Sequence, residues 1–305
     1  MTSGTRMTGR ASLMAMLRRF ADRHPDLLRP LRPPLLALIH RLAERENRTH
    51  DALLNRFTGL LAQDPCLRVD EFEGEFFLDP RSALLRRVLV SGHYEPVLSR
   101  LCATHCDSQR DVLDIGANVG FHAVLFARHL AGRKVLSVEP TRRALERLKR
   151  NVKHNGVDDR VIVHHGAVSH TPGDVLIKTI AGREEYSSLG DLVHPSIVGA
   201  DFQTESVRAD KLDALVSQYA LDPGFLKIDV EGAELWVLQG AHEVLSQSRP
   251  VILAELSDPL LRANGASAAM VVDLLGRYDY DIRDPQRPDA RPGSREFGDI
   301  LCVPR

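Results

Sequence analysis

The sequence contains few cysteines and no long apolar run. Its four cysteines stand at positions 66, 102, 106 and 302 without CxxC spacing, so the pattern indicates neither a disulfide framework nor a zinc-binding motif. The apolar run Leu35–Ile39 is far shorter than the roughly 20 residues that cross a bilayer. We therefore expect free thiols, a reducing and cytoplasmic compartment, and no transmembrane segment.

The sequence also lacks an excess of charge of either sign. Its 40 Lys and Arg residues nearly balance 41 Asp and Glu residues, which leaves a formal net charge of -1. Since a nucleic-acid backbone selects for basic surfaces, the composition predicts no nucleic-acid partner. With 43% hydrophobic residues, the chain is rich enough in apolar side chains to bury one large α/β core.

Residues 1–66 are predicted to form an N-terminal helical extension, and residues 67–305 the main domain. Apolar residues recur at spacings of three and four within Leu35–Leu42 and Leu53–Leu61, which is typical of an amphipathic helix. Apolar faces of this kind seldom stay exposed in a monomer. We expect them to cover a substrate pocket or to form a homodimer contact, with binding to a membrane surface as the alternative.

Strand and helix patterns alternate along the main domain, after a hairpin predicted over Leu67–Leu78 and a helix predicted over Ser82–His105. The expected core strands are Val112–Ile115, Lys134–Glu139, Val161–His165, Phe225–Asp229 and Val251–Glu255, and the expected helices are Phe121–Leu130, Arg142–Asn155, Lys211–Tyr219 and Ala233–Gln247. This alternation predicts βαβ units and a doubly wound, Rossmann-like α/β fold with a mostly parallel sheet. Two last strands, 278–282 and 299–303, are predicted to form a terminal antiparallel hairpin at the sheet edge.

The ends of the first two core strands carry a pattern typical of nucleoside binding. Glycines in the loop Asp114–Gly120 permit a tight turn, and the helix that follows offers free N–H groups. Glu139-Pro140 ends the next strand, where a carboxylate accepts hydrogen bonds from ribose hydroxyls in such folds. An NAD-dependent oxidoreductase would use the same pocket and is the second hypothesis, although the loop lacks the G-x-G-x-x-G pattern of such enzymes. A non-catalytic nucleoside-binding protein is the third.

Two further stretches carry a resemblance to a known family. Asp114–Gly120 followed by Glu139-Pro140 resembles the first two motifs of class I S-adenosylmethionine-dependent methyltransferases, and Phe225–Ala241 is similar to the signature of the FkbM family. Gly92–Pro96, Ser187–Leu189 and Val207–Leu215 also resemble that family, and the likeness covers roughly 85–304. The resemblance implies a seven-strand sheet and S-adenosylmethionine as cofactor. It also implies methyl transfer to a hydroxyl of a small-molecule acceptor such as a sugar, a polyketide or another specialised metabolite.

The resemblance implies a role for each residue of these motifs. Asp114 would orient the methionine ammonium, Glu139 would take both ribose hydroxyls, and Gly166-Ala167 would border the adenine. The complete set of candidate cofactor-binding residues is Glu95, Asp114, Gly116, Asn118, Gly120, Glu139, Pro140, Gly166, Ala167 and Asp229.

Asp229, at the end of the fourth core strand, is predicted to carry the chemistry. It would act as the base that accepts the hydroxyl proton, or as a ligand to a divalent ion that acidifies the hydroxyl. Glu255 and Asp258 are candidates to complete the shell of such an ion, although the sequence predicts no dedicated metal site.

Lys227 and Glu231 are the other catalytic candidates, because they flank Asp229 at two-residue spacing and would share its face in strand geometry. Each also has a structural interpretation. Glu231 lies past the expected strand end and would cap the following helix through Gly232. Lys227 would form a buried ion pair with Glu234.

Overall fold

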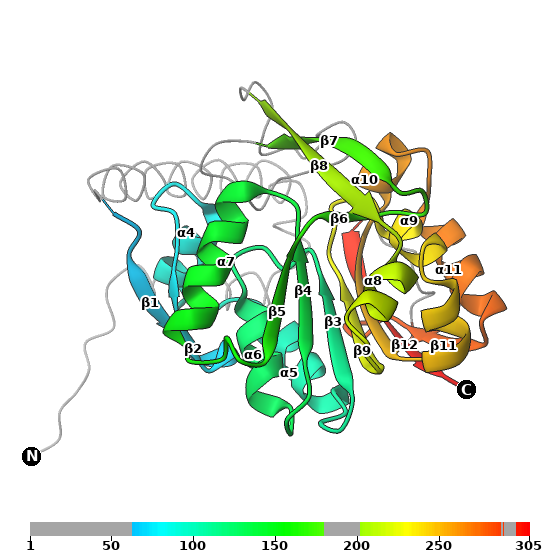
Figure 1. The fold of residues 1–305 in the computed structure, drawn as a ribbon, viewed down its shortest axis with the longest axis horizontal. Helices are drawn as coiled ribbons and strands as arrows, with labels where there is room; N and C mark the ends of the chain where they lie inside the picture. Colours follow the sequence, from blue (N-terminus) through cyan, green and yellow to red (C-terminus); the bar gives the residue numbers. More distant parts are fainter. Residues whose placement is uncertain (1–62, 180–201, 288, 290–296) are drawn as a thin grey trace, which may run out of the picture. The chain divides into compact units, whose positions relative to one another are not determined.

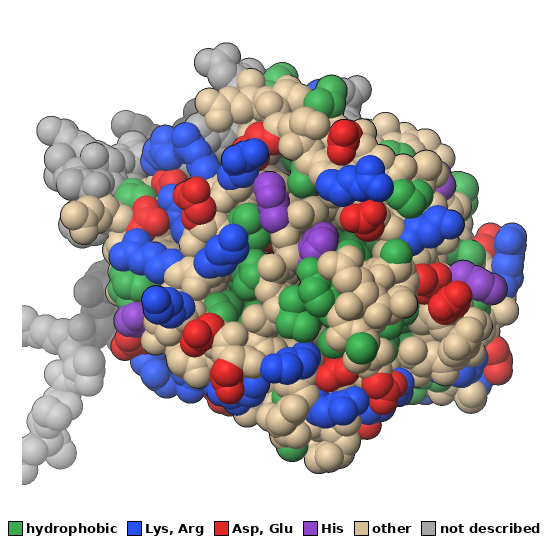
Figure 2. All heavy atoms as spheres, viewed as in Figure 1, with side chains coloured by type: hydrophobic (Ala, Val, Ile, Leu, Met, Phe, Trp, Pro, Cys, Tyr) green, Lys and Arg blue, Asp and Glu red, His purple; other side chains and the backbone are tan. Residues whose placement is uncertain are grey.

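The computed structural model describes residues 63–179, 202–287, 289 and 297–305 (Figure 1). The apolar helix faces predicted within 1–66 and the Ser187–Leu189 motif lie outside the described residues, so the N-terminal extension stays a prediction. Within the described part of the chain, no helix combines the length and the apolar character that a membrane span requires. On the face shown in Figure 2, basic and acidic side chains are interspersed, in keeping with the balanced composition.

A seven-stranded sheet forms the centre of the domain, in the order β11-β12-β10-β9-β3-β4-β5. Its strands are β3 (Asp111–Ile115), β4 (Val135–Glu139), β5 (Val161–His165), β9 (Pro223–Ile228), β10 (Val251–Ser257), β11 (Tyr280–Arg283) and β12 (Phe297–Pro304). The five strands from β10 to β5 run parallel, whereas β12 pairs antiparallel with both β10 and β11. The predicted doubly wound α/β fold with a terminal antiparallel hairpin is confirmed.

Helices cover both faces of this sheet because neighbouring residues of each central strand point to opposite faces. In β3, Val112 enters one buried cluster and Leu113 the other. The helices of the first cluster are α4 (Ala83–Ser91), α5 (Pro96–His105), α6 (Phe121–His129) and α7 (Arg142–His154). Those of the second cluster are α8 (Leu212–Gln218), α9 (Glu234–Gln239), α10 (Asp258–Ala263) and α11 (Ala268–Arg277). Figure 1 shows the two groups on either side of the sheet.

Two of the predicted helices are interrupted. The segment expected to be one helix over Ser82–His105 forms α4 and α5, because Gly92 ends α4 in the left-handed conformation and Pro96 begins α5. The segment expected over Ala233–Gln247 forms α9 and a π-helical turn, η3 (Val244–Ser248). At the break, a Cβ atom on Gly240 would lie 2.5 Å from the Ser169 carbonyl oxygen.

Two small sheets accompany the central one. The predicted hairpin over Leu67–Leu78 is present as β1 (Cys66–Val69) and β2 (Gly74–Phe77), joined by the 3-10 turn η1 (Asp70–Phe72). A second sheet, which the sequence pattern did not predict, contains β6 (Ala167–Val168), β8 (Gln203–Asp210) and β7 (Gly173–Thr179) in that order. This sheet follows directly from β5 and so lies next to the end of the central strands (Figure 1).

Candidate active site

The turn after β3 is packed against the end of β9 by backbone contact. Gly116 has φ +82, and a Cβ atom there would lie 1.8 Å from the Asp229 carbonyl oxygen. The Asp229 amide donates to the Ile115 carbonyl at 3.0 Å. Because these two loops touch, the structure brings Asp114 and Asp229 to the same edge of the sheet.

Glu139 fixes the glycine loop at the carboxyl end of β4. One carboxylate oxygen accepts the Asn118 amide at 2.9 Å, and the other accepts the amide and hydroxyl of Thr141 at 2.9 and 2.7 Å. Burial raises the pKa of Glu139 to about 7, against these hydrogen bonds, which lower it. Asn118 adopts φ 48, and its buried side-chain oxygen has no hydrogen-bond partner among the described residues. The two predicted cofactor-binding residues therefore form one unit.

Asp114 is a fully buried carboxylate with unused acceptor capacity. It has 0% exposure, and neither of its oxygens has a hydrogen-bond partner in the described part of the chain. Its nearest ion-pair contact is the Lys227 Nζ, 3.9 Å from Oδ1. Burial raises the pKa of Asp114 to about 6, while Lys227 lowers it. Since buried carboxylates are ordinarily hydrogen-bonded, this site is suited to a ligand that donates N–H groups.

Lys227 lies between the two aspartates, at the carboxyl ends of β3 and β9, where folds of this class have their binding crevice. Its Nζ is 3.1 Å from Asp229 Oδ2, and its pairing with Asp114 and Asp229 replaces the ion pair with Glu234 that we considered from the sequence. Burial alone would lower the pKa of Lys227, but Asp229, Asp114 and other carboxylates raise it well above its usual value. These carboxylates therefore favour the charged form of Lys227, whose Nζ pairs directly with Asp229.

Further carboxylates surround this lysine. Burial, followed by repulsion from Asp229, raises the pKa of Glu95 to about 7. The pKa of Glu255, in β10, rises to about 10, chiefly because of the Asp229 charge and then because of burial. Asp258 instead accepts the Ala268 amide at 2.9 Å and pairs with Arg262. Of the two residues named as possible ion ligands, only Glu255 thus belongs electrostatically to the Asp229 cluster.

The turn after β9 departs from the expected strand geometry. β9 ends at Ile228, and Glu231 lies in a turn with φ 51, so strand alternation does not extend to it. Gly232 donates its amide to Glu234 Oε1 at 3.0 Å, which gives Glu234 the capping contact that we had considered for Glu231. Glu231 nevertheless remains beside the crevice, since its charge raises the pKa of Glu255.

The residues expected at the adenine end lie next to Glu139. The Gly166 amide donates to the Glu139 carbonyl at 3.3 Å, and Ala167 begins β6 as a buried residue. His165 Nε2 lies 3.0 Å from the Pro140 carbonyl oxygen. The second small sheet, absent from the sequence analysis, thus sets the position of Gly166-Ala167 relative to Glu139.

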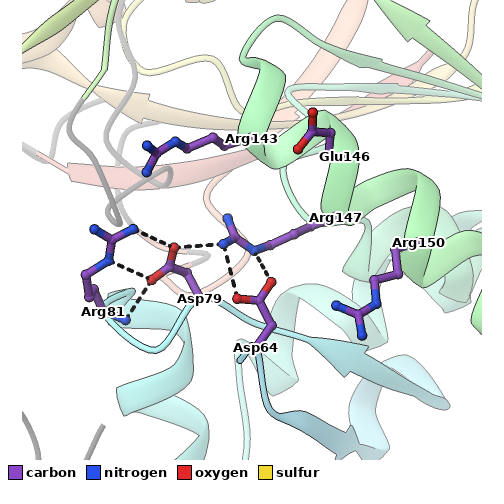
Figure 3. A pocket seen from close by; sticks show the side chains of 7 residues that line it. All are labelled: Asp64, Asp79, Arg81, Arg143, Glu146, Arg147 and Arg150. Atoms are coloured by element: carbon purple, nitrogen blue, oxygen red, sulfur yellow. Dashed lines mark hydrogen bonds and ion pairs between the residues drawn. The ribbon is translucent and has the colours of Figure 1, made fainter. Parts of the chain in front are cut away.

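A separate polar pocket of about 360 Å³ lies over α7, away from the predicted site residues (Figure 3). It is lined by Asp64, Asp79, Arg81, Arg143, Glu146, Arg147 and Arg150. Arg147 pairs with Asp64 at 2.8 Å and with Asp79 at 2.7 Å, and Arg81 pairs with Asp79 at 3.1 Å. These pairs join the chain on either side of the β1–β2 hairpin to α7.

The buried glutamates predict a stability that falls as pH rises. Burial raises the pKa of Glu139 and of Glu234 to about 7, so the folded state holds their protons more tightly than the unfolded chain. The stabilisation is complete below the ordinary glutamate pKa of 4.5 and is lost as the pH passes through about 7. The free energy of unfolding, measured in urea, should fall by on the order of 1–3 kcal/mol between about pH 5.5 and about pH 8.

Glu234→Gln is the control for this pH dependence, because the amide oxygen still accepts from Gly232 but does not titrate. The variant should show a shallower slope over the same range. A stability that rises between the two pH values would contradict the assignment of these glutamates as buried and poorly compensated.

The chain belongs to the FkbM methyltransferase domain family, whose model matches residues 114–282, more than half of the chain. The match begins at Asp114 and includes the Glu139, Lys227, Asp229 and Glu231 positions. The matched segment therefore contains most of the charged residues that gather around Asp229. A methyltransferase domain of Rossmann-like fold is established by this match and by the sheet topology.

Individual relatives share little sequence identity with this chain. The chain is 24% identical over 201 residues to the AMB antimetabolite synthetase AmbE of Pseudomonas aeruginosa, a match that covers 56% of this chain and 9% of that protein. Among solved structures, methyltransferase FkbM from Methylobacillus flagellatus is 18% identical, with a TM-score of 0.44 over 64% of this chain and 43% of that one. An O-methyltransferase from Bacillus cereus in complex with SAH is 15% identical, with a TM-score of 0.41 over 83% and 97%. The match thus spans less than half of the length of each of the first two of these relatives.

Proposed function

We propose that this methyltransferase transfers a methyl group from S-adenosylmethionine to a hydroxyl of a small molecule, such as a sugar, a polyketide or another specialised metabolite. One observation carries the cofactor assignment. Asp114 is buried with both oxygens unpartnered, at the same edge of the sheet as Glu139. A molecule with an ammonium group at one end and ribose hydroxyls at the other matches these two acceptors.

Each residue of the crevice has a defined task in this proposal. Asp114 accepts from the ammonium group, Glu139 accepts from the ribose hydroxyls, and Gly166-Ala167 border the adenine. The bound cofactor supplies a methyl group on a sulfonium, which is open to direct displacement. The protein therefore has to hold the acceptor in line and to remove its proton, and no covalent intermediate with the enzyme is required.

Asp229 is the proposed base. Lys227 donates to one of its carboxylate oxygens at 3.1 Å, which orients the carboxylate. The other carboxylate oxygen makes no hydrogen bond to the described residues, so it is available for the hydroxyl of an acceptor. Removal of that proton as the methyl group arrives avoids a positively charged oxonium product.

The proposal also covers the cellular compartment and the binding partners of the protein. All four cysteines are free thiols, which supports a reducing, cytoplasmic compartment. The acceptor is proposed to be a small molecule, with no nucleic-acid partner. A homodimer through the N-terminal helices remains the proposal for residues outside the described part of the chain.

Glu139→Gln tests the cofactor assignment. The amide keeps one oxygen as an acceptor but loses the charge, so one charge-assisted hydrogen bond to ribose weakens by about 1.5–3 kcal/mol. The dissociation constant of S-adenosylhomocysteine, measured by calorimetry, should rise by roughly 10- to 100-fold.

The exposed variant Glu243→Gln, just before η3, is the matched control and should bind S-adenosylhomocysteine as the wild type does. Unchanged affinity in Glu139→Gln would show that this carboxylate does not hold the nucleoside. Binding of NAD in place of S-adenosylhomocysteine would favour the oxidoreductase hypothesis.

A further inference from the structure

Three side chains of metal-ligating types meet at the outer face of the β1–β2 hairpin, two from the hairpin and one from α7. In the antiparallel register, Cys66 faces Phe77 and Arg68 faces Glu75, so Cys66 and Glu75 lie diagonally on one face of the hairpin. The alternate residues, Val69 and Phe76 among them, point into the core. The outer face is therefore the side on which polar side chains of the two strands meet.

His154, in the last turn of α7, completes this group. Its Nε2 lies 3.0 Å from Glu75 Oε2 and 3.8 Å from Cys66 Sγ. The three potential ligand atoms all lie within 4.8 Å of one another. A thiolate, an imidazole and a carboxylate are the ligand types that zinc takes in proteins.

The spacing of the three atoms fits a tetrahedral ion. With Zn–S near 2.3 Å and Zn–N and Zn–O near 2.0 Å, tetrahedral angles put sulfur about 3.5 Å from nitrogen and nitrogen about 3.3 Å from oxygen. The observed separations of 3.8 and 3.0 Å differ from these by about 0.3 Å, which small side-chain rotations accommodate. Three protein ligands leave one position for water.

The backbone that carries these ligands is held independently of any ion. Asn155 accepts the Glu75 amide at 3.0 Å and donates to the Glu75 carbonyl at 2.8 Å. Asn151, one turn earlier, accepts the Phe77 amide at 2.8 Å. These two carboxamides attach the edge of β2 to α7, so Glu75 and His154 are fixed near each other before a metal binds, which lowers the cost of binding.

We propose that Cys66, Glu75 and His154 form a zinc site, separate from the methyl-transfer crevice, that joins the β1–β2 hairpin to the end of α7. This proposal replaces the expectation that Cys66 is a free thiol.

Metal titration of the full chain, purified without a polyhistidine tag and stripped with a chelator, tests the proposal. Zinc, titrated in competition with a chromophoric chelator, should bind at one ion per chain. Cobalt in its place should give a thiolate-to-cobalt charge-transfer absorption, which reports sulfur in the coordination shell. Cys66→Ser and His154→Ala should each weaken zinc binding by about 100-fold or more, beyond the effect of losing an outer-shell contact.

Cys106→Ser is the matched control, since Cys106 is a free thiol outside this cluster, and it should retain wild-type affinity. Far-ultraviolet circular dichroism of each metal-free variant separates lost binding from lost folding. The proposal is overturned if the wild-type chain binds no zinc, if cobalt gives no thiolate band, or if Cys66→Ser binds zinc as tightly as Cys106→Ser.

Discussion

Gly116→Ala should abolish binding of S-adenosylhomocysteine and lower the free energy of unfolding by at least about 3 kcal/mol. The added Cβ would lie 1.8 Å from the Asp229 carbonyl oxygen, well inside any allowed contact, and φ is +82. Relief requires that the loop after β3 and the loop after β9 move apart. That movement separates Asp114 from Asp229, so cofactor and acceptor sites are lost together. Urea unfolding and calorimetry measure the two effects.

Gly132→Ala isolates the contact from the backbone strain. Gly132 also has a positive φ, +74, but a Cβ there meets nothing within 4 Å. This control should cost only the left-handed conformation, about 1–2 kcal/mol, and should leave binding intact. The packing of Asp229 against Gly116 would be disproved if both variants lost equal stability and both retained S-adenosylhomocysteine binding.

Asp229→Asn should slow methyl transfer by about 10²- to 10⁴-fold, the usual contribution of a positioned general base. The amide has nearly the same shape and still accepts from Lys227, but it does not take up a proton at neutral pH. The rate is measured as transfer of labelled methyl from saturating S-adenosylmethionine into the small-molecule fraction of a metabolite extract. S-adenosylhomocysteine affinity should change much less than the rate.

Asp222→Asn, at the opposite end of β9, is the matched control. Its side chain is 57% exposed and pairs with Arg110, so the transfer rate should stay near that of the wild type. EDTA separates two versions of the mechanism, since it stops transfer only if Asp229 acts through a divalent ion. A nearly full rate in Asp229→Asn would rule out both versions and leave positioning of the acceptor as the source of catalysis.

The half-site around Glu139 was predictable because it depends on residues close together in sequence. Asp114, Gly116 and Asn118 lie in one loop, and Glu139 ends the next strand of the parallel sheet, so topology alone places them together. The break between α4 and α5 was also encoded locally. Gly92 and Pro96 are strong signals for the end of one helix and the start of the next. The single-helix prediction gave more weight to the apolar periodicity on both sides of them.

Contacts between distant segments were not predictable. β6 and β8 pair across more than 30 residues, from Ala167 to Ala209, and no periodicity identifies such partners. The pairing of Lys227 with Asp114 depends on the β3–β9 register, which sets these two residues side by side although they are more than 100 positions apart in sequence. Cys66 and His154 are 88 residues apart, so only the packing of the hairpin on α7 shows that they meet.

Calorimetric titration of the wild-type chain with S-adenosylhomocysteine, and separately with NAD, tests the central claim most directly. We expect one S-adenosylhomocysteine per chain with a dissociation constant on the order of 1–100 μM, equivalent to about 5–8 kcal/mol, and no heat of binding with NAD. Saturable binding of NAD, or no binding of S-adenosylhomocysteine by folded protein, would contradict the assignment of this crevice to methyl transfer.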